Sequence, residues 1–152
     1  MISRTRILSL EINMILVTYY EGAYRPTLRI DLRSIDRLRD VKAIFEKLSS
    51  GGLHRFFLNQ LPSSVMNSPI RAVGLFVRLD DCASVRHKKI TCFTGKDGAV
   101  TFEWTQTPDQ WATTYGLTEG LEQAGILGVS AHQYLTDESS DDVLVELALN
   151  EL

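Results

Sequence analysis

Alternating hydrophobic and polar positions predict the first elements of the chain. From Thr27 to Arg33, Leu and Ile alternate with charged residues, which is the pattern of a strand buried on one side. The preceding segment, Ile2 to Tyr20, is rich in Ile, Leu, Val, Thr and Tyr and predicts one long strand or two paired strands. Apolar residues then recur at helical spacing from Ile35 to Leu48, after Ser34, which can cap a helix. We therefore expect strands followed by one helix in the first third of the chain.

The middle of the chain predicts further strands. His54 to Leu61 is typical of a short strand, and Pro62 to Pro69 of a polar loop. Arg71 to Leu79 alternates but carries apolar residues on both faces, which indicates a central strand. Lys88 to Thr105 consists of two alternating runs around Gly95-Lys96-Asp97-Gly98, and this predicts a β-hairpin.

A second helix is indicated after the hairpin, because Thr107 can be its N-cap, Pro108 its first residue and Gln110 the third residue of a capping box. We expect it to run to about Ala124. Strands at residues 130–136 and 143–149 complete the pattern. The order predicts a single α+β domain over residues 1–152, with a mainly antiparallel sheet of about six to eight strands and two helices packed on one face.

Composition agrees with this class. The chain has 152 residues, of which 44% are hydrophobic, enough for one domain with its own core. No apolar run approaches the roughly 20 residues of a membrane span, so no membrane association is expected. Two cysteines are too few for a disulfide framework. With no targeting segment visible, we expect a cytoplasmic protein with free thiols.

Charge is distributed unevenly along the sequence. Residues 1–96 contain all 16 Lys and Arg and 8 Asp and Glu, whereas residues 97–152 contain 11 acidic residues and no basic one. Two explanations remain open. The charges pair internally when strands of the two parts lie side by side, or an acidic face binds a basic partner. The second explanation requires exposed, unpaired carboxylates, and the candidates are Asp137, Glu138, Asp141 and Asp142.

Motifs for specific chemistry are weak. Cys82, His87 and Cys92 lack a fourth ligand and the short spacing of a structural zinc site. No glycine-rich oxyanion turn accompanies a possible Cys–His nucleophile pair, and dinucleotide, P-loop and metalloprotease motifs are absent from the sequence. We therefore predict no metal and no cofactor. The pI of about 5.6 argues against nucleic acid binding by the basic cluster at residues 86–89.

Two functions of different class remain. The favoured one is a non-catalytic interaction module, of the kind that inhibits a basic partner such as a nuclease-like toxin, with the acidic C-terminal third as its contact surface. The alternative is a small enzyme or ligand-binding protein. Its pocket would be formed by Trp104, Trp111, Tyr115, His132 and Tyr134, although aromatic residues at a strand–helix junction usually belong to the core. The sequence favours the non-catalytic role and gives no indication of the oligomeric state.

Overall fold

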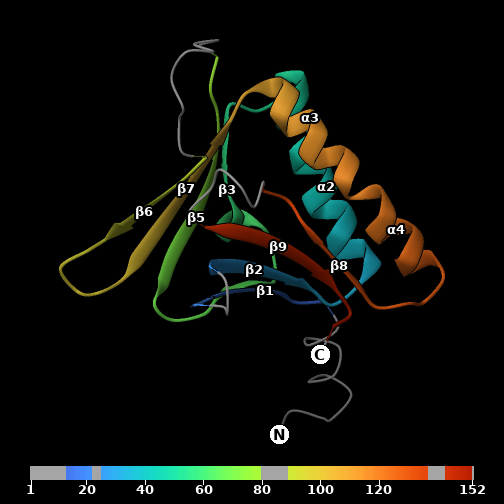
Figure 1. The fold of residues 1–152 in the computed structure, drawn as a ribbon, viewed down its shortest axis with the longest axis horizontal. Coiled ribbons are helices and arrows are strands. Elements are labelled where there is room, and N and C mark those ends of the chain that lie inside the picture. The colour runs from blue at the N-terminus through green and yellow to red at the C-terminus, as the bar shows by residue number, and fades with distance from the viewer. Residues whose placement is uncertain (1–12, 22–24, 80–88, 137–142, 152) are drawn as a thin grey trace, which may run out of the picture.

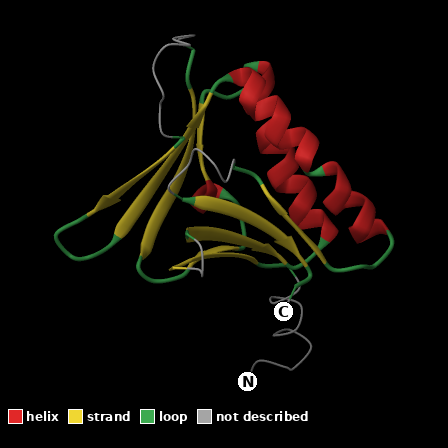
Figure 2. Cartoon of the chain, in the orientation of Figure 1, coloured by secondary structure: helices red, strands yellow, loops and turns green. Residues whose placement is uncertain are grey.

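The protein is represented by a computed structural model that describes residues 13–21, 25–79, 89–136 and 143–151. These residues contain nine strands, three α-helices and one 3-10 helix (Figures 1 and 2). The strands are β1 (Ile15–Glu21), β2 (Pro26–Leu32), β3 (Arg55–Phe57), β4 (Ser64–Met66), β5 (Ile70–Val77), β6 (Ile90–Thr94), β7 (Val100–Gln106), β8 (Ala131–Tyr134) and β9 (Leu144–Leu149). The helices are α2 (Ile35–Ser50), α3 (Pro108–Leu117), α4 (Glu119–Ile126) and the 3-10 helix η1 (Leu58–Gln60).

Five strands form sheet A in the order β4-β1-β2-β9-β8. The hairpin pairs β1–β2 and β8–β9 are antiparallel, whereas β4 runs parallel to β1 and β9 runs parallel to β2. In the β2–β9 register, Arg29 lies opposite Glu146 and Ile30 opposite Leu147. The last strand of the described chain is therefore inserted between β2 and β8.

Four strands form sheet B in the order β3-β5-β7-β6. The β6–β7 pair is the expected antiparallel hairpin, and Gly98 in its turn has φ +82°, a conformation that glycine adopts without strain. β7 pairs with β5 in parallel. The hairpin extends away from the helices, at the opposite side of the molecule (Figure 1).

The three helices lie together on one side of the sheets (Figure 2). Ser34 caps α2, since its hydroxyl accepts a hydrogen bond from the Arg37 amide, and Gly51 ends the helix in the left-handed conformation. The predicted capping box of Thr107 and Gln110 is present at the start of α3. None of the helices in the described ranges is long and apolar enough to cross a membrane.

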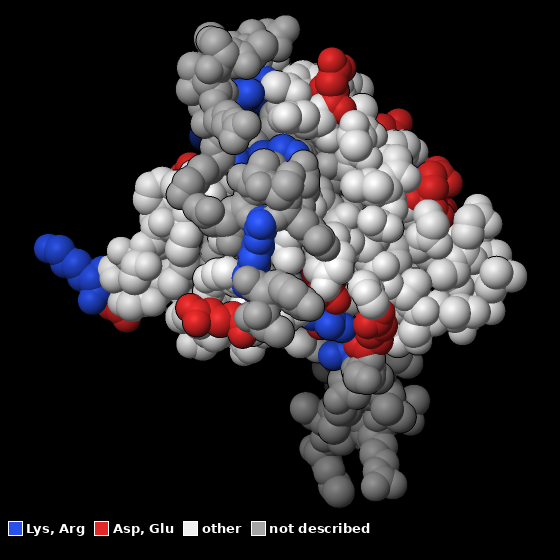
Figure 3. Space-filling model, viewed as in Figure 1, with Lys and Arg blue, Asp and Glu red and all other residues white. Residues whose placement is uncertain are grey.

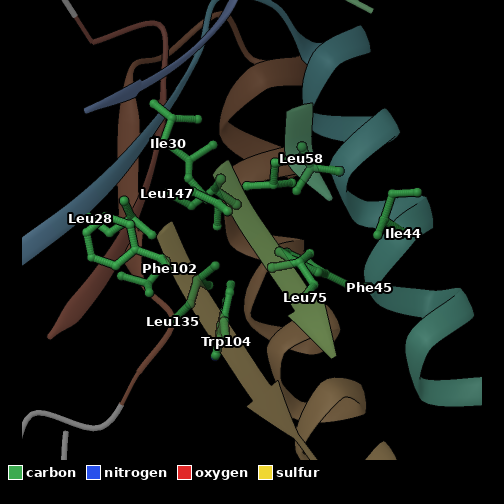
Figure 4. Packing of buried hydrophobic residues seen from close by; sticks show 14 of the residues in the cluster. Leu28, Ile30, Ile44, Phe45, Leu58, Leu75, Phe102, Trp104, Leu135 and Leu147 are labelled. Carbon is green, nitrogen blue, oxygen red and sulfur yellow. The ribbon is translucent and has the colours of Figure 1, made fainter. Parts of the chain in front are cut away.

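One hydrophobic core joins both sheets to the helices (Figure 4). Its largest members are Phe45 of α2, Phe102 and Trp104 of β7, and Trp111 of α3, all with no exposed surface. The Trp104 and Trp111 ring centroids are 4.8 Å apart, and Phe45 contacts both rings. These aromatic contacts hold α2 and α3 against sheet B.

The structure confirms an α+β domain and the predicted hairpin, but it corrects the sheet arrangement. Two mixed sheets replace one mainly antiparallel sheet, because β9 and β7 pair in parallel with strands that are distant in sequence. Alternation within a strand carries no information about its neighbour, so these pairings were not predicted.

Three local predictions are also corrected. The loop predicted at Pro62 to Pro69 contains β4, and the second helix is divided into α3 and α4 at Thr118. The Thr118 hydroxyl donates a hydrogen bond to the Tyr115 carbonyl at 2.6 Å, which competes with continued helical hydrogen bonding. Cys92, whose alternation with Ile90 along the strand predicts a position in the core, is exposed, as are all residues of β6 after Ile90.

Candidate functional site

A group of polar side chains lies on the face of sheet A that points away from the core. Strand periodicity explains its position, because Leu28 and Ile30 point into the core and Arg29 and Asp31 therefore point outward. Tyr20, His132, Tyr134, Glu146 and Glu151 lie with them. We call these seven residues the outer-face cluster.

Arg29 is the centre of the outer-face cluster. Its Nε and Nη2 atoms donate to the two carboxylate oxygens of Asp31 at 3.0 and 3.1 Å. Its Nη1 atom donates to Glu146 Oε1 at 3.2 Å, and Nη2 lies 3.6 Å from Glu151 Oε2. Burial by itself would lower the pKa of Arg29, but the hydrogen bonds and charges of these carboxylates outweigh burial and raise it.

Tyr20 and His132 extend this network on either side. The Tyr20 hydroxyl donates to Glu146 Oε2 at 3.2 Å. Burial, followed by the charge of Glu146 and this hydrogen bond, raises the pKa of Tyr20. The Nδ1 atom of His132 lies 2.5 Å from Glu151 Oε1. The ring centroids of His132 and Tyr134 are 6.0 Å apart, and the two rings meet edge-on.

The outer-face cluster carries an excess of negative charge. Asp31, Glu146 and Glu151 contribute three negative charges and Arg29 one positive charge, which leaves a net charge of −2 when His132 is neutral. Glu146 is buried beneath this surface, whereas Tyr20 and Tyr134 are 39% and 37% exposed. Asp31 is also buried, so Glu151 is the one carboxylate of the cluster that is partly exposed.

Several carboxylates outside the cluster also pair with residues of the basic part of the chain. Glu119 and Glu122 of α4 pair with Lys42 of α2, and Glu122 also lies 3.3 Å from Arg39. In Figure 3, red and blue side chains adjoin near the lower centre of the view.

Asp97 pairs with Arg71 across sheet B. Of the seven acidic residues after Lys96 that the structure describes, Asp97, Glu119, Glu122, Glu146 and Glu151 pair with arginine or lysine of residues 1–96. Internal pairing therefore explains much of the charge asymmetry in the described ranges.

A metal site in the outer-face cluster is not supported. Potential ligand atoms of His132, Glu146 and Glu151 lie within 4.8 Å of one another. Arg29, however, donates a hydrogen bond to Glu146 and lies 3.6 Å from Glu151, so a positive charge already lies beside both carboxylates. A metal ion would have to displace these contacts.

The five residues predicted to form a pocket are not brought together. Trp104 and Trp111 are fully buried, and Tyr115 packs at the edge of the same core, where Lys42 Nζ lies 5.0 Å from its ring centroid. His132 and Tyr134 are exposed on β8. The two groups therefore have different surroundings.

A depression of about 370 Å³ lies elsewhere, between residues 66–71 and the turn of the β6–β7 hairpin. Arg71 and Asp97, which form an ion pair, are both part of its lining. We assign no chemistry to it.

Sequence reasoning missed most of the outer-face cluster. Arg29 and Glu146 become neighbours only through the parallel β2–β9 register, and nothing in either strand alone indicates this pairing. The four predicted partner-binding residues, Asp137, Glu138, Asp141 and Asp142, lie outside the described residues, as do Cys82 and His87. Along the chain, the segment with the four acidic residues connects β8 to β9, and both of these strands carry cluster residues.

Comparisons with known proteins give no family for this chain: no protein-family model, no curated protein and no solved structure matches it significantly.

Proposed function

We propose that this protein is a non-catalytic interaction module that binds a basic protein, of the inhibitor or immunity type, through the acidic outer side of sheet A. The observation that carries the proposal is the net charge of −2 on the outer-face cluster, where Arg29 balances only one of three carboxylates. Complementary charge accelerates association and discriminates against partners of the wrong sign.

The side chains around these carboxylates are also suited to a protein interface. Tyrosine is enriched in interface cores and hot spots because it buries a large area at low entropic cost. Tyr20 and Tyr134 are partly exposed on either side of Glu146. Along the chain, the connection between β8 and β9 contains Asp137, Glu138, Asp141 and Asp142.

The enzymatic alternative has one supporting observation. Glu151 contacts Nδ1 of His132, and such a contact can orient an imidazole that acts as a general base through its other nitrogen. However, half of the His132 side-chain surface is exposed, and the tryptophans expected to shape its pocket lie in the core. We therefore favour the binding function.

The proposal is tested by association kinetics at two salt concentrations. Basic proteins captured from native lysate are purified, and their association rates are measured with wild type and with the variant Asp137→Asn/Glu138→Gln/Asp141→Asn/Asp142→Asn. We expect the wild-type rate to fall with salt, and the variant to associate more slowly and to depend less on salt.

Glu46→Gln is the matched control, because Glu46 is an exposed carboxylate of α2 with no ion pair among the described residues. If the four carboxylates form the contact surface, their replacement should change stability by within about 0.5 kcal/mol, as exposed surface substitutions usually do, and the variant should remain folded. If the fourfold variant instead melts several degrees lower and binds as wild type does, these carboxylates pair internally and the proposal is wrong.

A further inference from the structure

We infer that the basic partner places an arginine side chain on the outer-face cluster, with its guanidinium group paired to Glu151 and stacked against the exposed ring of Tyr134. This inference rests on the proposed function and names the partner group that the site would receive. It follows from the acceptor positions, the aromatic surface and the residual charge of the cluster.

Glu151 is the carboxylate that a partner can reach. Glu146 is 95% buried in its side chain, and its oxygens already accept hydrogen bonds from Arg29 and Tyr20. A quarter of the Glu151 side-chain surface is exposed. Its Oε1 atom faces His132, and its Oε2 atom lies 3.6 Å from Arg29, a distance too long for a strong hydrogen bond. Because each carboxylate oxygen can accept two hydrogen bonds, Glu151 has acceptor capacity for a second cation.

The aromatic rings beside Glu151 favour a planar cation. His132 and Tyr134 project from the same face of β8, two residues apart, and Tyr134 lies opposite Glu146 in the β8–β9 register. On the same face, Tyr20 of β1 reaches Glu146 from the direction opposite to β8. A cation at Glu151 is therefore close to exposed π surfaces, whose negative faces attract positive charge.

Arginine fits this surface better than lysine does. The guanidinium group is planar, pairs with a carboxylate through two parallel hydrogen bonds and stacks on aromatic rings. It is also more weakly hydrated than an ammonium group, so less solvation is lost when it enters a partly buried site. One added arginine would reduce the net charge of the cluster from −2 to −1.

The test uses two short peptides that alternate glycine with either arginine or lysine, titrated into the full chain and followed by backbone amide NMR shifts. We expect shifts centred on His132, Tyr134 and Glu151, and tighter binding of the arginine peptide. Glu151→Gln should weaken that peptide about two- to fivefold, the range expected for one exposed ion pair.

Two further variants make the result specific. Tyr134→Ser should reduce the preference for arginine over lysine, because it removes the stacking ring but no charge. Glu46→Gln on α2 removes the same charge as Glu151→Gln and should leave both affinities unchanged. Melting curves of each variant establish that it is folded. Equal affinities for the two peptides, equal effects of the two glutamate substitutions, or shifts centred elsewhere would overturn the inference.

The failure of this inference is distinguishable from failure of the proposed function. If a captured basic protein binds with the expected salt dependence and Glu151→Gln binds it as wild type does, the arginine contact is wrong and the function stands. If its association is independent of salt and of the acidic substitutions, the proposed function itself is refuted.

Discussion

Trp104 and Trp111 allow a paired test of what a hydrogen bond contributes inside this core. Both indoles are fully buried and their rings are in contact. They differ in one respect. Nε1 of Trp111 donates a hydrogen bond to the Phe76 carbonyl at 3.0 Å, whereas Nε1 of Trp104 is buried with no acceptor among the described residues. Substitution by phenylalanine removes a similar volume at each site.

The two substitutions should therefore differ in cost. Replacement of the bicyclic indole by a single phenyl ring leaves a cavity at both sites and lowers the free energy of unfolding by about 1–2 kcal/mol, a fraction of the cost of complete Trp→Ala truncation. Trp111→Phe also loses a hydrogen bond with a net value of about 0.5–1.5 kcal/mol. Trp104→Phe removes a buried N–H group that lacks a partner, which offsets part of its cavity cost. We expect Trp111→Phe to be less stable than Trp104→Phe by about 1 kcal/mol.

Urea denaturation followed by far-ultraviolet circular dichroism measures this difference, because that signal depends on neither tryptophan alone. The slope of unfolding free energy against denaturant should be the same for both variants and wild type, so that midpoints report stability. Equal losses of stability, or a larger loss for Trp104→Phe, would refute the assigned role of the Trp111 hydrogen bond.

Three further predictions concern the helices. Thr107→Ala removes the N-cap hydroxyl of α3 and should lower the free energy of unfolding by about 1 kcal/mol in urea. Gly116→Ala should raise the melting temperature, because a Cβ at this position meets nothing within 4 Å and alanine favours the helix. Gly125→Ala should lower the melting temperature, because its Cβ would lie 2.9 Å from a buried leucine methyl group. The hydrogen bond from Lys42 is the main reason that the pKa of Glu122 is lowered in the folded protein. Ionised Glu122 therefore adds to the free energy of unfolding above its unfolded-state pKa, and this stabilisation is lost as the pH falls through its folded-state pKa. In thermal melts below about pH 4.3, wild type should therefore lose more stability than Glu122→Gln.

The structural features that could be predicted from the sequence depend on residues that lie close together along the chain. The β6–β7 turn needs a glycine at Gly98, and the start of α3 needs a hydroxyl and an amide three residues apart, so both could be inferred within a short window. The order of sheet A could not, because β2 and β9 are separated by most of the chain and either could pair with several strands.

The candidate site, too, was predictable only as far as it depends on residues close together along the chain. His132 and Tyr134 were proposed from the sequence as site residues, but together with Trp104 and Trp111, which are core residues. The residues that set the charge around His132 and Tyr134 are Arg29 and Glu146, which are neighbours only through the β2–β9 register. Residue type alone indicated possible chemistry but not which side chains share a surface.

The central position of β9 in sheet A has a consequence for how this chain assembles. β1 and β2 can form their hairpin early, but the other edge of β2 has no partner until β9, the final strand in the described chain, has been synthesised. All six residues of β9 are buried in the finished fold. During translation, β2 therefore presents an open edge on which other chains can pair, and the long separation of the two strands slows closure of the sheet. A nascent chain that stalls before β9 would retain this aggregation-prone edge.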